Sequence, residues 1–260
     1  MTNRHRTRIG LIVPSTNTTC EADFQMVAPP DVTIHSHRLW ITNDAMELDG
    51  MEAMNAEIES AAQYLGTANV DIIAYGCTTG SFYKGLGWDE EMVELIENAS
   101  GGIPAIGTST SIVQALRHLK AKKISVATPY PKWNNDRLQV YLKAQGFEVL
   151  NIEGEPIASK SGNQGINEQA PETIVEFASS LCLPEADVLL CSCTAWRSME
   201  AAQELELQTG RPIVTSNQSM VWSAFRRLGV DKPVQGFGKI LDELNKESHG
   251  YKYLSSSESD

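Results

Sequence analysis

The stretch DIIAYGCT, residues 71–78, recurs as DVLLCSCT at residues 187–194, 116 positions further along the chain. A second stretch behaves in the same way, because RIGLIVPSTN from Arg8 recurs as KISVATPYPK from Lys123, 115 positions on. Both pairs begin with a short apolar run and end in small polar residues. Such a pattern is typical of a buried strand followed by a loop.

A third pair completes the repeat. GIPAIGTSTSIVQALRHL from Gly102 recurs as GRPIVTSNQSMVWSAFRRL from Gly210, 108 positions on, with one further residue inserted before the final Leu. Three blocks in the same order indicate a duplicated unit of the fold. In parallel α/β sheets, ligands bind outside the carboxyl ends of the strands, so equivalent loops of two such units can face each other across a cleft.

Short β-branched or apolar runs alternate with longer amphipathic stretches along the chain. Strands are expected at Arg8–Val13, Val32–Arg38, Ile72–Tyr75, Pro104–Ile106, Lys123–Thr128, Glu148–Asn151, Val188–Cys191 and Pro212–Val214. Helices are expected at Ala53–Leu65, Trp88–Ala99, Ser111–Leu119, Asn134–Gln145, Pro171–Ser180 and Arg197–Thr209. This alternation predicts an α/β fold of parallel sheets flanked by helices.

We therefore predict two pseudo-symmetric lobes with the active site in the cleft between them. The first lobe comprises residues 1–115 with a C-terminal return at 217–250, and the second comprises residues 116–216. Residues 251–260 form a polar tail.

Composition excludes several classes of protein. The chain has 260 residues, of which 42% are hydrophobic and 21% charged, which disfavours disordered and collagen-like proteins. Its 21 basic and 33 acidic residues give a formal net charge of −12. Such a surface repels phosphate backbones, and no basic run is longer than Lys120–Lys123, so we expect no nucleic-acid partner.

Neither a membrane partner nor an oxidising compartment is expected. The N-terminus lacks a long apolar stretch, and runs such as Val70–Tyr75 fall far short of the roughly 20 residues of a membrane span. We predict a cytoplasmic protein, in which the five cysteines stay reduced. Their odd number and the absence of CxxC disfavour both a disulfide framework and a structural zinc site.

Two thiols occupy the same position of the repeat. Cys77 and Cys193 each end a predicted strand and precede a threonine, so we expect them to oppose each other across a ligand. Backbone N–H groups in such a turn are expected to favour the thiolate and lower the thiol pKa. The alternative is a small buried hydrophobic residue, and we retain this interpretation for Cys20, Cys182 and Cys191.

Polar loops follow the first strand of each repeat. VPSTNTT, residues 13–19, offers amide and hydroxyl groups suited to a carboxylate, although the same residues also cap helices. In its counterpart TPYPKWN, Tyr130 is either an aromatic residue at the edge of the core or a hydrogen-bond donor. The runs Gly107–Ser111 and Thr215–Ser219 either continue this polar rim or cap helices.

Several common motifs are absent: GxGxxG after a strand, GxxxxGK[ST], HExxH and GxSxG. None of the five histidines adjoins Cys77 or Cys193 in sequence. His35 and His37 alternate on a predicted strand but have no acidic or thiol partner at a suitable spacing, so we predict no metal site. A Cys–His protease stays open in principle but leaves the second cysteine unexplained.

The motifs VPSTNTT, YGCTTGSFYKGLG, CSCTAWRSM and GFGKILDE together resemble the Asp/Glu racemase superfamily, in the branch of maleate cis–trans isomerase and arylmalonate decarboxylase. The resemblance covers nearly the whole chain. VPSTNTT is close to the isomerase form of the first loop, and two cysteines are the arrangement of isomerases and racemases. SFYKG and GFGKILDE instead resemble the decarboxylase, in which glycine replaces the first cysteine.

The resemblance implies roles for seven residues. Cys77 would be the nucleophile and Cys193 its acid/base partner. The implied substrate-binding residues are Asn17, Thr78, Tyr130, Asn163 and Thr194, with Thr78 and Thr194 contributing backbone donors. The resemblance also implies a small carboxylate or dicarboxylate substrate, no cofactor, and a homodimer or larger homo-oligomer.

The expected activity is cofactor-independent cis–trans isomerisation of maleate to fumarate, through addition of a thiolate to the double bond and rotation about C2–C3. Two alternative activities stay open: a two-cysteine racemase and an arylmalonate-type decarboxylase. A non-catalytic ligand-binding protein also stays open, because a fold does not determine a function.

Overall fold

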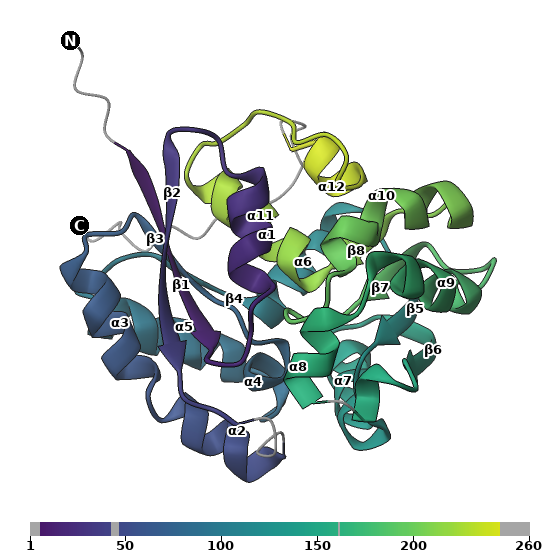
Figure 1. Ribbon diagram of the computed structural model, residues 1–260, viewed down its shortest axis with the longest axis horizontal. Helices are drawn as coiled ribbons and strands as arrows, with labels where there is room; N and C mark the ends of the chain where they lie inside the picture. Colours follow the sequence, from purple (N-terminus) through teal and green to yellow (C-terminus); the bar gives the residue numbers. More distant parts are fainter. Residues whose placement is uncertain (1–5, 43–46, 161, 245–260) are drawn as a thin grey trace.

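The computed structural model describes residues 6–42, 47–160 and 162–244, which form two four-stranded parallel sheets (Figure 1). The first sheet has the order β2-β1-β3-β4, from β1 (Thr7–Pro14), β2 (Val32–Leu39), β3 (Ile72–Tyr75) and β4 (Ala105–Gly107). The second has the order β6-β5-β7-β8, from β5 (Lys123–Thr128), β6 (Glu148–Gly154), β7 (Val188–Cys191) and β8 (Ile213–Thr215). The two orders are equivalent.

Strand pairing follows the sequence repeat. β1 pairs with β3 through Ile9 and Ile72, and β5 pairs with β7 through Ile124 and Val188, which are the repeat-equivalent positions. All eight predicted strands are present, and β6 continues three residues beyond its predicted end. The predicted fold of two similar α/β lobes is thus confirmed. The first lobe contains the β2-β1-β3-β4 sheet, and the second contains the β6-β5-β7-β8 sheet. In each lobe the polar loops follow the carboxyl ends of the strands.

Helices follow the strands and cover the sheets (Figure 1). In the first half they are α1 (Cys20–Val27), α2 (Leu48–Asn55), α3 (Ile58–Thr67), α4 (Thr78–Phe82), α5 (Trp88–Ala99) and α6 (Thr108–His118). In the second half they are α7 (Lys132–Ala144), the 3₁₀ turn η1 (Ala158–Lys160), α8 (Gly162–Glu168), α9 (Pro171–Leu181), α10 (Ser198–Thr209), α11 (Ser216–Arg227) and α12 (Lys239–Asp242).

Three helix predictions need correction. The helix predicted at 53–65 is split, because α2 ends at Asn55 and α3 begins at Ile58. The helix predicted from Ser111 begins at Thr108, because the polar run before it forms the first helical turn. α11 was missed: every residue from Ser216 to Phe225 is buried although five of these ten are Ser, Asn or Gln, so its polar positions do not mark a solvent-exposed face.

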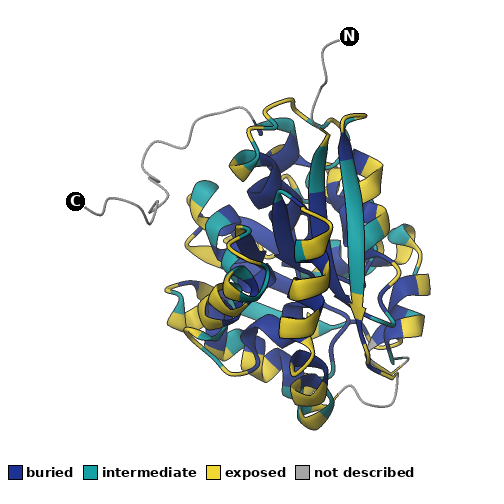
Figure 2. Ribbon diagram, turned by 90° about the vertical axis from the view of Figure 1, so that its left-hand side faces the viewer, coloured by how far each residue is buried: buried dark blue, intermediate teal, exposed yellow. Residues whose placement is uncertain are grey.

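Among the described residues, one of two buried apolar clusters spans both lobes, and the other lies within the first lobe. A single cluster of buried residues includes Ile9 and Ile72 of the first sheet together with Ile124 and Val188 of the second. α6 and α11 pack against each other, and Figure 2 shows buried strands among helices whose outer sides are exposed. A shared core holds the two sets of strand-end loops in a fixed relation.

The proposed division at residues 115–116 and 216–217 stays a prediction, because α11 contacts β3 and β4 of the first sheet and also β8 of the second. Residues 245–250 of the return and the tail 251–260 lie outside the described residues. Within the described part, no helix is long and apolar enough to cross a membrane.

Candidate active site

Cys77 lies at the end of β3 and forms the N-cap of α4. Its Sγ accepts a hydrogen bond from the backbone N–H of Gly80 at 3.4 Å, and the residue is 7% exposed. The Tyr75 hydroxyl lies beside the same sulfur. A Cβ on Gly80 would stand 2.1 Å from the Tyr75 hydroxyl oxygen and 3.1 Å from Cys77 Sγ, so glycine leaves the room that this arrangement needs.

Cys193 has an equivalent environment after β7. Its Sγ accepts a hydrogen bond from the backbone N–H of Ala195 at 3.4 Å, and the residue is 6% exposed. The Tyr130 hydroxyl lies beside the Cys193 thiol and lowers its pKa, against the effect of burial. Tyr130 is thus buried next to the second thiol, and its role as a donor to the substrate stays a prediction. Each thiol has one backbone donor and one tyrosine.

Burial raises the pKa of both thiols. The pKa of Cys77 rises to about 11 and that of Cys193 to about 12, although the N–H donors and the tyrosine hydroxyls act in the opposite direction. The expectation of lowered pKa values is thus wrong, because desolvation outweighs the local donors. A negative charge on Cys77 raises the pKa of Cys193 further. Both thiols are therefore kept protonated chiefly by burial, with a smaller contribution at Cys193 from the charge of Cys77.

A third thiol adjoins this pair. Cys20 is fully buried, as predicted for a core residue, but its Sγ lies 2.9 Å from the position of a Cβ on Gly76, the residue before Cys77. Burial, followed by the negative charges of Asp23 and Glu21, raises the Cys20 pKa well above its usual value. It stays a neutral thiol beside the site.

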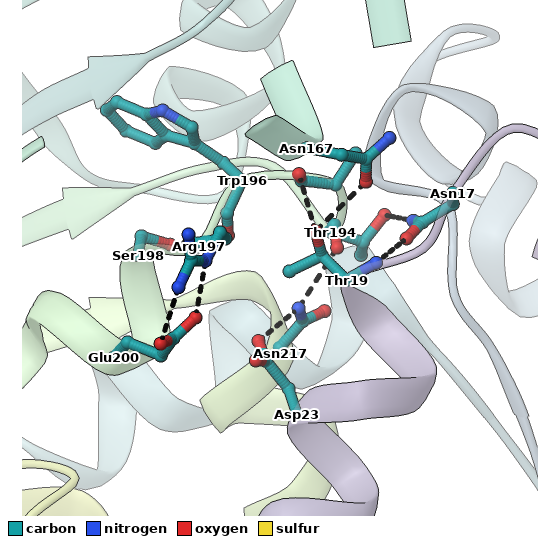
Figure 3. A network of polar contacts seen from close by, with 11 residues as sticks. Asn17, Thr19, Asp23, Asn167, Thr194, Trp196, Arg197, Ser198, Glu200 and Asn217 are labelled. Atoms are coloured by element: carbon teal, nitrogen blue, oxygen red, sulfur yellow. Dashed lines mark hydrogen bonds and ion pairs between the residues drawn. The ribbon is translucent and has the colours of Figure 1, made fainter. Parts of the chain in front are cut away.

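Asn17 connects the first loop to the second lobe (Figure 3). Its Oδ1 accepts hydrogen bonds from the backbone N–H groups of Thr19 and Cys20, both at 3.0 Å, and so caps α1. Its Nδ2 donates to Thr194 Oγ1 at 3.1 Å. The second N–H of Nδ2 bonds to no other described residue, which leaves it for a carboxylate. The helix-end contacts expected of this loop are thus present at Asn17, and its carboxylate-binding role stays a prediction.

α8 holds the first loop from the opposite side. Asn163 Nδ2 donates to Thr16 Oγ1 at 2.6 Å, and Asn167 Nδ2 donates to the Thr16 carbonyl oxygen at 2.9 Å. Asn167 Oδ1 also accepts from the backbone N–H of Thr18 at 3.1 Å. Sequence reasoning missed Asn167, although its four-residue spacing from Asn163 places both on one helix face.

The threonines after the cysteines link the two halves of the chain. Thr78 Oγ1 donates to Ser216 Oγ at 3.0 Å, and Thr194 Oγ1 donates to the Gly76 carbonyl oxygen at 3.1 Å. The backbone donors that reach the sulfurs belong to Gly80 and Ala195. The N–H groups of Thr78 and Thr194 bond to no other described residue and stay free for a ligand. Of the seven predicted site residues, Asn17 contacts Thr194 directly and Asn163 contacts Thr16 of the same loop, while their roles at a substrate stay predictions.

A buried polar network supports the Cys193 turn (Figure 3). Asn217 Nδ2 donates to Asp23 Oδ2 at 2.7 Å and to the Thr194 carbonyl oxygen at 3.0 Å. Burial raises the pKa of Asp23 to about 7. Asp23 and Asn217 were missed, although Asn217 lies in the predicted polar run 215–219. At the start of that run Thr215 caps α11, accepting from the Gln218 N–H at 3.1 Å.

Charged groups stay outside the thiol pair. Arg38 donates to the Asn17 carbonyl oxygen at 2.7 Å and pairs with Glu21 at 2.8 Å, so it braces the first loop. His35 contacts Thr33, and His37 stacks on Tyr64 with ring centroids 5.2 Å apart. Among the residues described, no three His, Cys, Asp or Glu side chains are grouped so as to hold a metal ion.

The arrangement provides two neutral thiols and a set of uncharged donors. One thiol can add to an electrophilic carbon while the other supplies or removes a proton. Amide and hydroxyl groups can hold carboxylates without a competing countercharge. The site therefore suits covalent or proton-transfer chemistry on a small carboxylic acid.

Comparison with known proteins gives one matching family model. The model of the arylmalonate decarboxylase family, Amdase, matches residues 9–241. A maleate isomerase of Pseudomonas putida is 29% identical over 246 residues, covering 90% of this chain and 96% of that protein. An arylmalonate decarboxylase of Bordetella bronchiseptica is 26% identical over 238 residues, with 90% and 96% covered.

A solved structure of the Nocardia farcinica maleate cis–trans isomerase is also similar. It is a cysteine-to-serine mutant with a covalently bound succinylcysteine intermediate. The sequences are 25% identical, the TM-score is 0.85, and the match covers 91% of this chain and 98% of the other.

Proposed function

The chain belongs to the arylmalonate decarboxylase family, and within that family we propose that it catalyses the cis–trans isomerisation of maleate to fumarate. The observation that carries the proposal is the pair of buried thiols at repeat-equivalent strand ends, each with a backbone donor. Four curated relatives named maleate isomerase, 27–29% identical over 90% or more of this chain, support this choice.

The reaction begins with covalent addition. A carbon–carbon double bond does not rotate freely, and attack of Cys77 sulfur on C2 converts it to a single bond. The electron pair of the double bond moves toward C3 and its carboxylate, where Cys193 donates its proton to C3. The Cys77 S–H bond breaks as the sulfur bonds to C2, and this proton replaces the one that Cys193 gives to C3. Rotation about C2–C3 and the reverse sequence of proton transfers then expel the sulfur and give fumarate.

The surroundings of the two thiols support Cys77 as the nucleophile and Cys193 as the proton donor. A charge on Cys77 raises the pKa of Cys193, so Cys193 stays protonated while Cys77 attacks. Cys77 accepts from the Gly80 N–H and also benefits from the Tyr75 hydroxyl, both of which favour its thiolate. The succinylcysteine in the Nocardia farcinica isomerase is the product of such an addition in that protein.

The substrate carboxylates are assigned to uncharged donors. Asn17 offers its free amide N–H from the first lobe, and Tyr130 offers its hydroxyl from the second. Thr78 and Thr194 offer backbone N–H groups next to the two sulfurs, and Asn163 completes the set beside Thr16. Burial of this set excludes water, which strengthens each hydrogen bond to the developing charge and protects the adduct.

Two further features belong to the proposal. A cytoplasmic location is supported by the five cysteines, all of which are free thiols. A homodimer or larger homo-oligomer, and catalysis without a cofactor, follow from the family resemblance of the loops.

The test is incubation of the purified protein with maleate, followed by ultraviolet or NMR detection of fumarate. Accumulation of fumarate supports the proposal. The alternative activities give different products from their own substrates: exchange of an α-proton identifies a racemase, and release of carbon dioxide from an arylmalonate identifies a decarboxylase. No turnover of maleate at any pH at which the fold persists would contradict the assignment.

A further inference from the structure

Two hydrogen bonds cross between the lobes to the turns that carry the thiols. Asn134, on α7 of the second lobe, donates from Nδ2 to Thr79 Oγ1 at 2.8 Å. Thr19, at the N-cap of α1 in the first lobe, has its Oγ1 2.9 Å from the Ala195 carbonyl oxygen. Thr79 and Ala195 each lie two residues after a site cysteine.

These bonds are related by the sequence repeat. Asn134 follows Thr19 by 115 positions, and Ala195 follows Thr79 by 116, which are the offsets of the first strands and of the cysteines. Each lobe therefore contacts the other lobe's cysteine turn from an equivalent position. The chemistry differs, since one bond comes from an amide and the other from a hydroxyl. The geometry of the contact is thus common to both halves while the residue type is not.

Both contacts act on the segment that holds the sulfur. The Ala195 carbonyl oxygen accepts from Thr19, and the N–H of the same residue donates to Cys193 Sγ at 3.4 Å. On the other side, Asn134 holds Thr79, and the next residue, Gly80, donates its N–H to Cys77 Sγ at 3.4 Å. Fixing each turn across the lobes therefore fixes the donor that favours its thiolate.

Burial increases the free-energy cost of losing either hydrogen bond. Thr19, Thr79, Asn134 and Ala195 are all buried, so a donor or acceptor left without its partner is not rescued by bulk water. The Thr19 hydroxyl also lies 2.9 Å from Asn167 Oδ1, so its one hydrogen is shared between two acceptors, both of them in the second lobe (Figure 3).

We propose that Thr19 and Asn134 are reciprocal positioning residues: each lobe sets the geometry of the cysteine turn in the other lobe. Neither residue acts on the reacting atoms. The inference rests on the proposed function only in taking the two thiols as the reacting groups. Its consequence is that correct placement of both thiols requires the two lobes to be assembled against each other.

The test compares the reactivities of the two thiols without any substrate. Wild type, Asn134→Leu and Thr19→Val are treated with iodoacetamide, and modification of each cysteine is followed by peptide mass spectrometry. For Asn134→Leu we expect the ratio of the Cys77 rate to the Cys193 rate to fall about three- to tenfold, the effect of one lost hydrogen bond. For Thr19→Val we expect the ratio to rise by a similar factor.

The crossed pattern separates positioning from general loosening, because a more open protein exposes both thiols and moves both rates together. Thr79→Val removes the same bond from its acceptor side and should reproduce Asn134→Leu even where that variant folds poorly. Thr19→Ser keeps the hydroxyl and should restore the wild-type ratio. Ratios that move in the same direction in both variants, or by less than about twofold, would overturn the inference. The readout does not depend on whether the protein isomerises maleate.

Discussion

Replacing Asp23 with Asn should stabilise the protein in a pH-dependent way. Burial raises the pKa of Asp23 from 3.8 to about 7, and this outweighs the hydrogen bond from Asn217, which favours the carboxylate. Between these pH values the folded protein keeps a proton that the unfolded chain has lost. The folded state binds more protons, so its stability falls as the pH rises through this window. The difference between the folded and unfolded pKa values of Asp23 lowers the free energy of unfolding by at most about 4 kcal/mol above pH 7.

The substitution removes this ionisation and retains the shape of the side chain. Its new carboxamide oxygen can still accept from Asn217 Nδ2 across the 2.7 Å contact. Near pH 4 the variant and the wild type should therefore be about equally stable, and the advantage of the variant should grow to a plateau near pH 8. Asp89, whose pKa burial also raises to about 7, is present in both proteins and cancels from the difference.

Urea unfolding at several pH values between about 5 and 8 measures this difference. The exposed Asp31→Asn is the matched control, since it makes the same chemical change at the surface. A stability difference that does not vary with pH, or a variant that loses most stability at the highest pH, would refute the argument from burial.

Three further substitutions test the site. Tyr75→Phe removes the hydroxyl that lowers the Cys77 pKa and that donates to Asn55 Oδ1, so iodoacetamide should modify Cys77 several-fold more slowly near neutral pH while Cys193 is unaffected. An unchanged Cys77 rate would contradict the effect on the thiol. Gly80→Ala places a methyl group 2.1 Å from the Tyr75 hydroxyl oxygen, so the free energy of unfolding measured in urea should fall by about 1–3 kcal/mol, and turnover should also fall. Wild-type stability and turnover would show that Tyr75 moves away freely. Asn17→Ala should lower kcat/KM about ten- to a hundredfold and also reduce thermal stability, because the side chain caps α1; activity equal to wild type would leave Asn17 as a cap alone.

Much of the fold was predictable, because short apolar strands and three sequence blocks that each occur twice are local features of the sequence. The thiol pair was predictable for the same reason, since Cys77 and Cys193 share a repeat position. α11 was not, because its polar residues Ser216–Ser219 are buried by packing against other parts of the chain rather than exposed. The predicted direction of the two thiol pKa shifts was wrong. The backbone donors belong to the local turns, whereas burial of the thiols arises from the packing of both lobes.

The supporting residues of the site were harder to predict. Asn167 contacts Thr18, and Asn217 contacts Asp23, across separations of 149 and 194 positions. An isolated asparagine in a helix carries no indication of such a partner. The repeat does relate Thr19 to Asn134, because the two positions differ by the offset of the first strands. That both contact the cysteine turn of the other lobe is visible only in the structure.

The central claim is covalent catalysis by Cys77 on maleate. The most direct measurement is mass spectrometry of the Cys193→Ser variant after mixing with maleate, with the modified residue located by peptide sequencing. The account predicts an adduct with the mass of one added maleic acid on Cys77, and no such adduct in Cys77→Ser. An adduct on another cysteine, or fumarate formation that persists in Cys77→Ser, would contradict it.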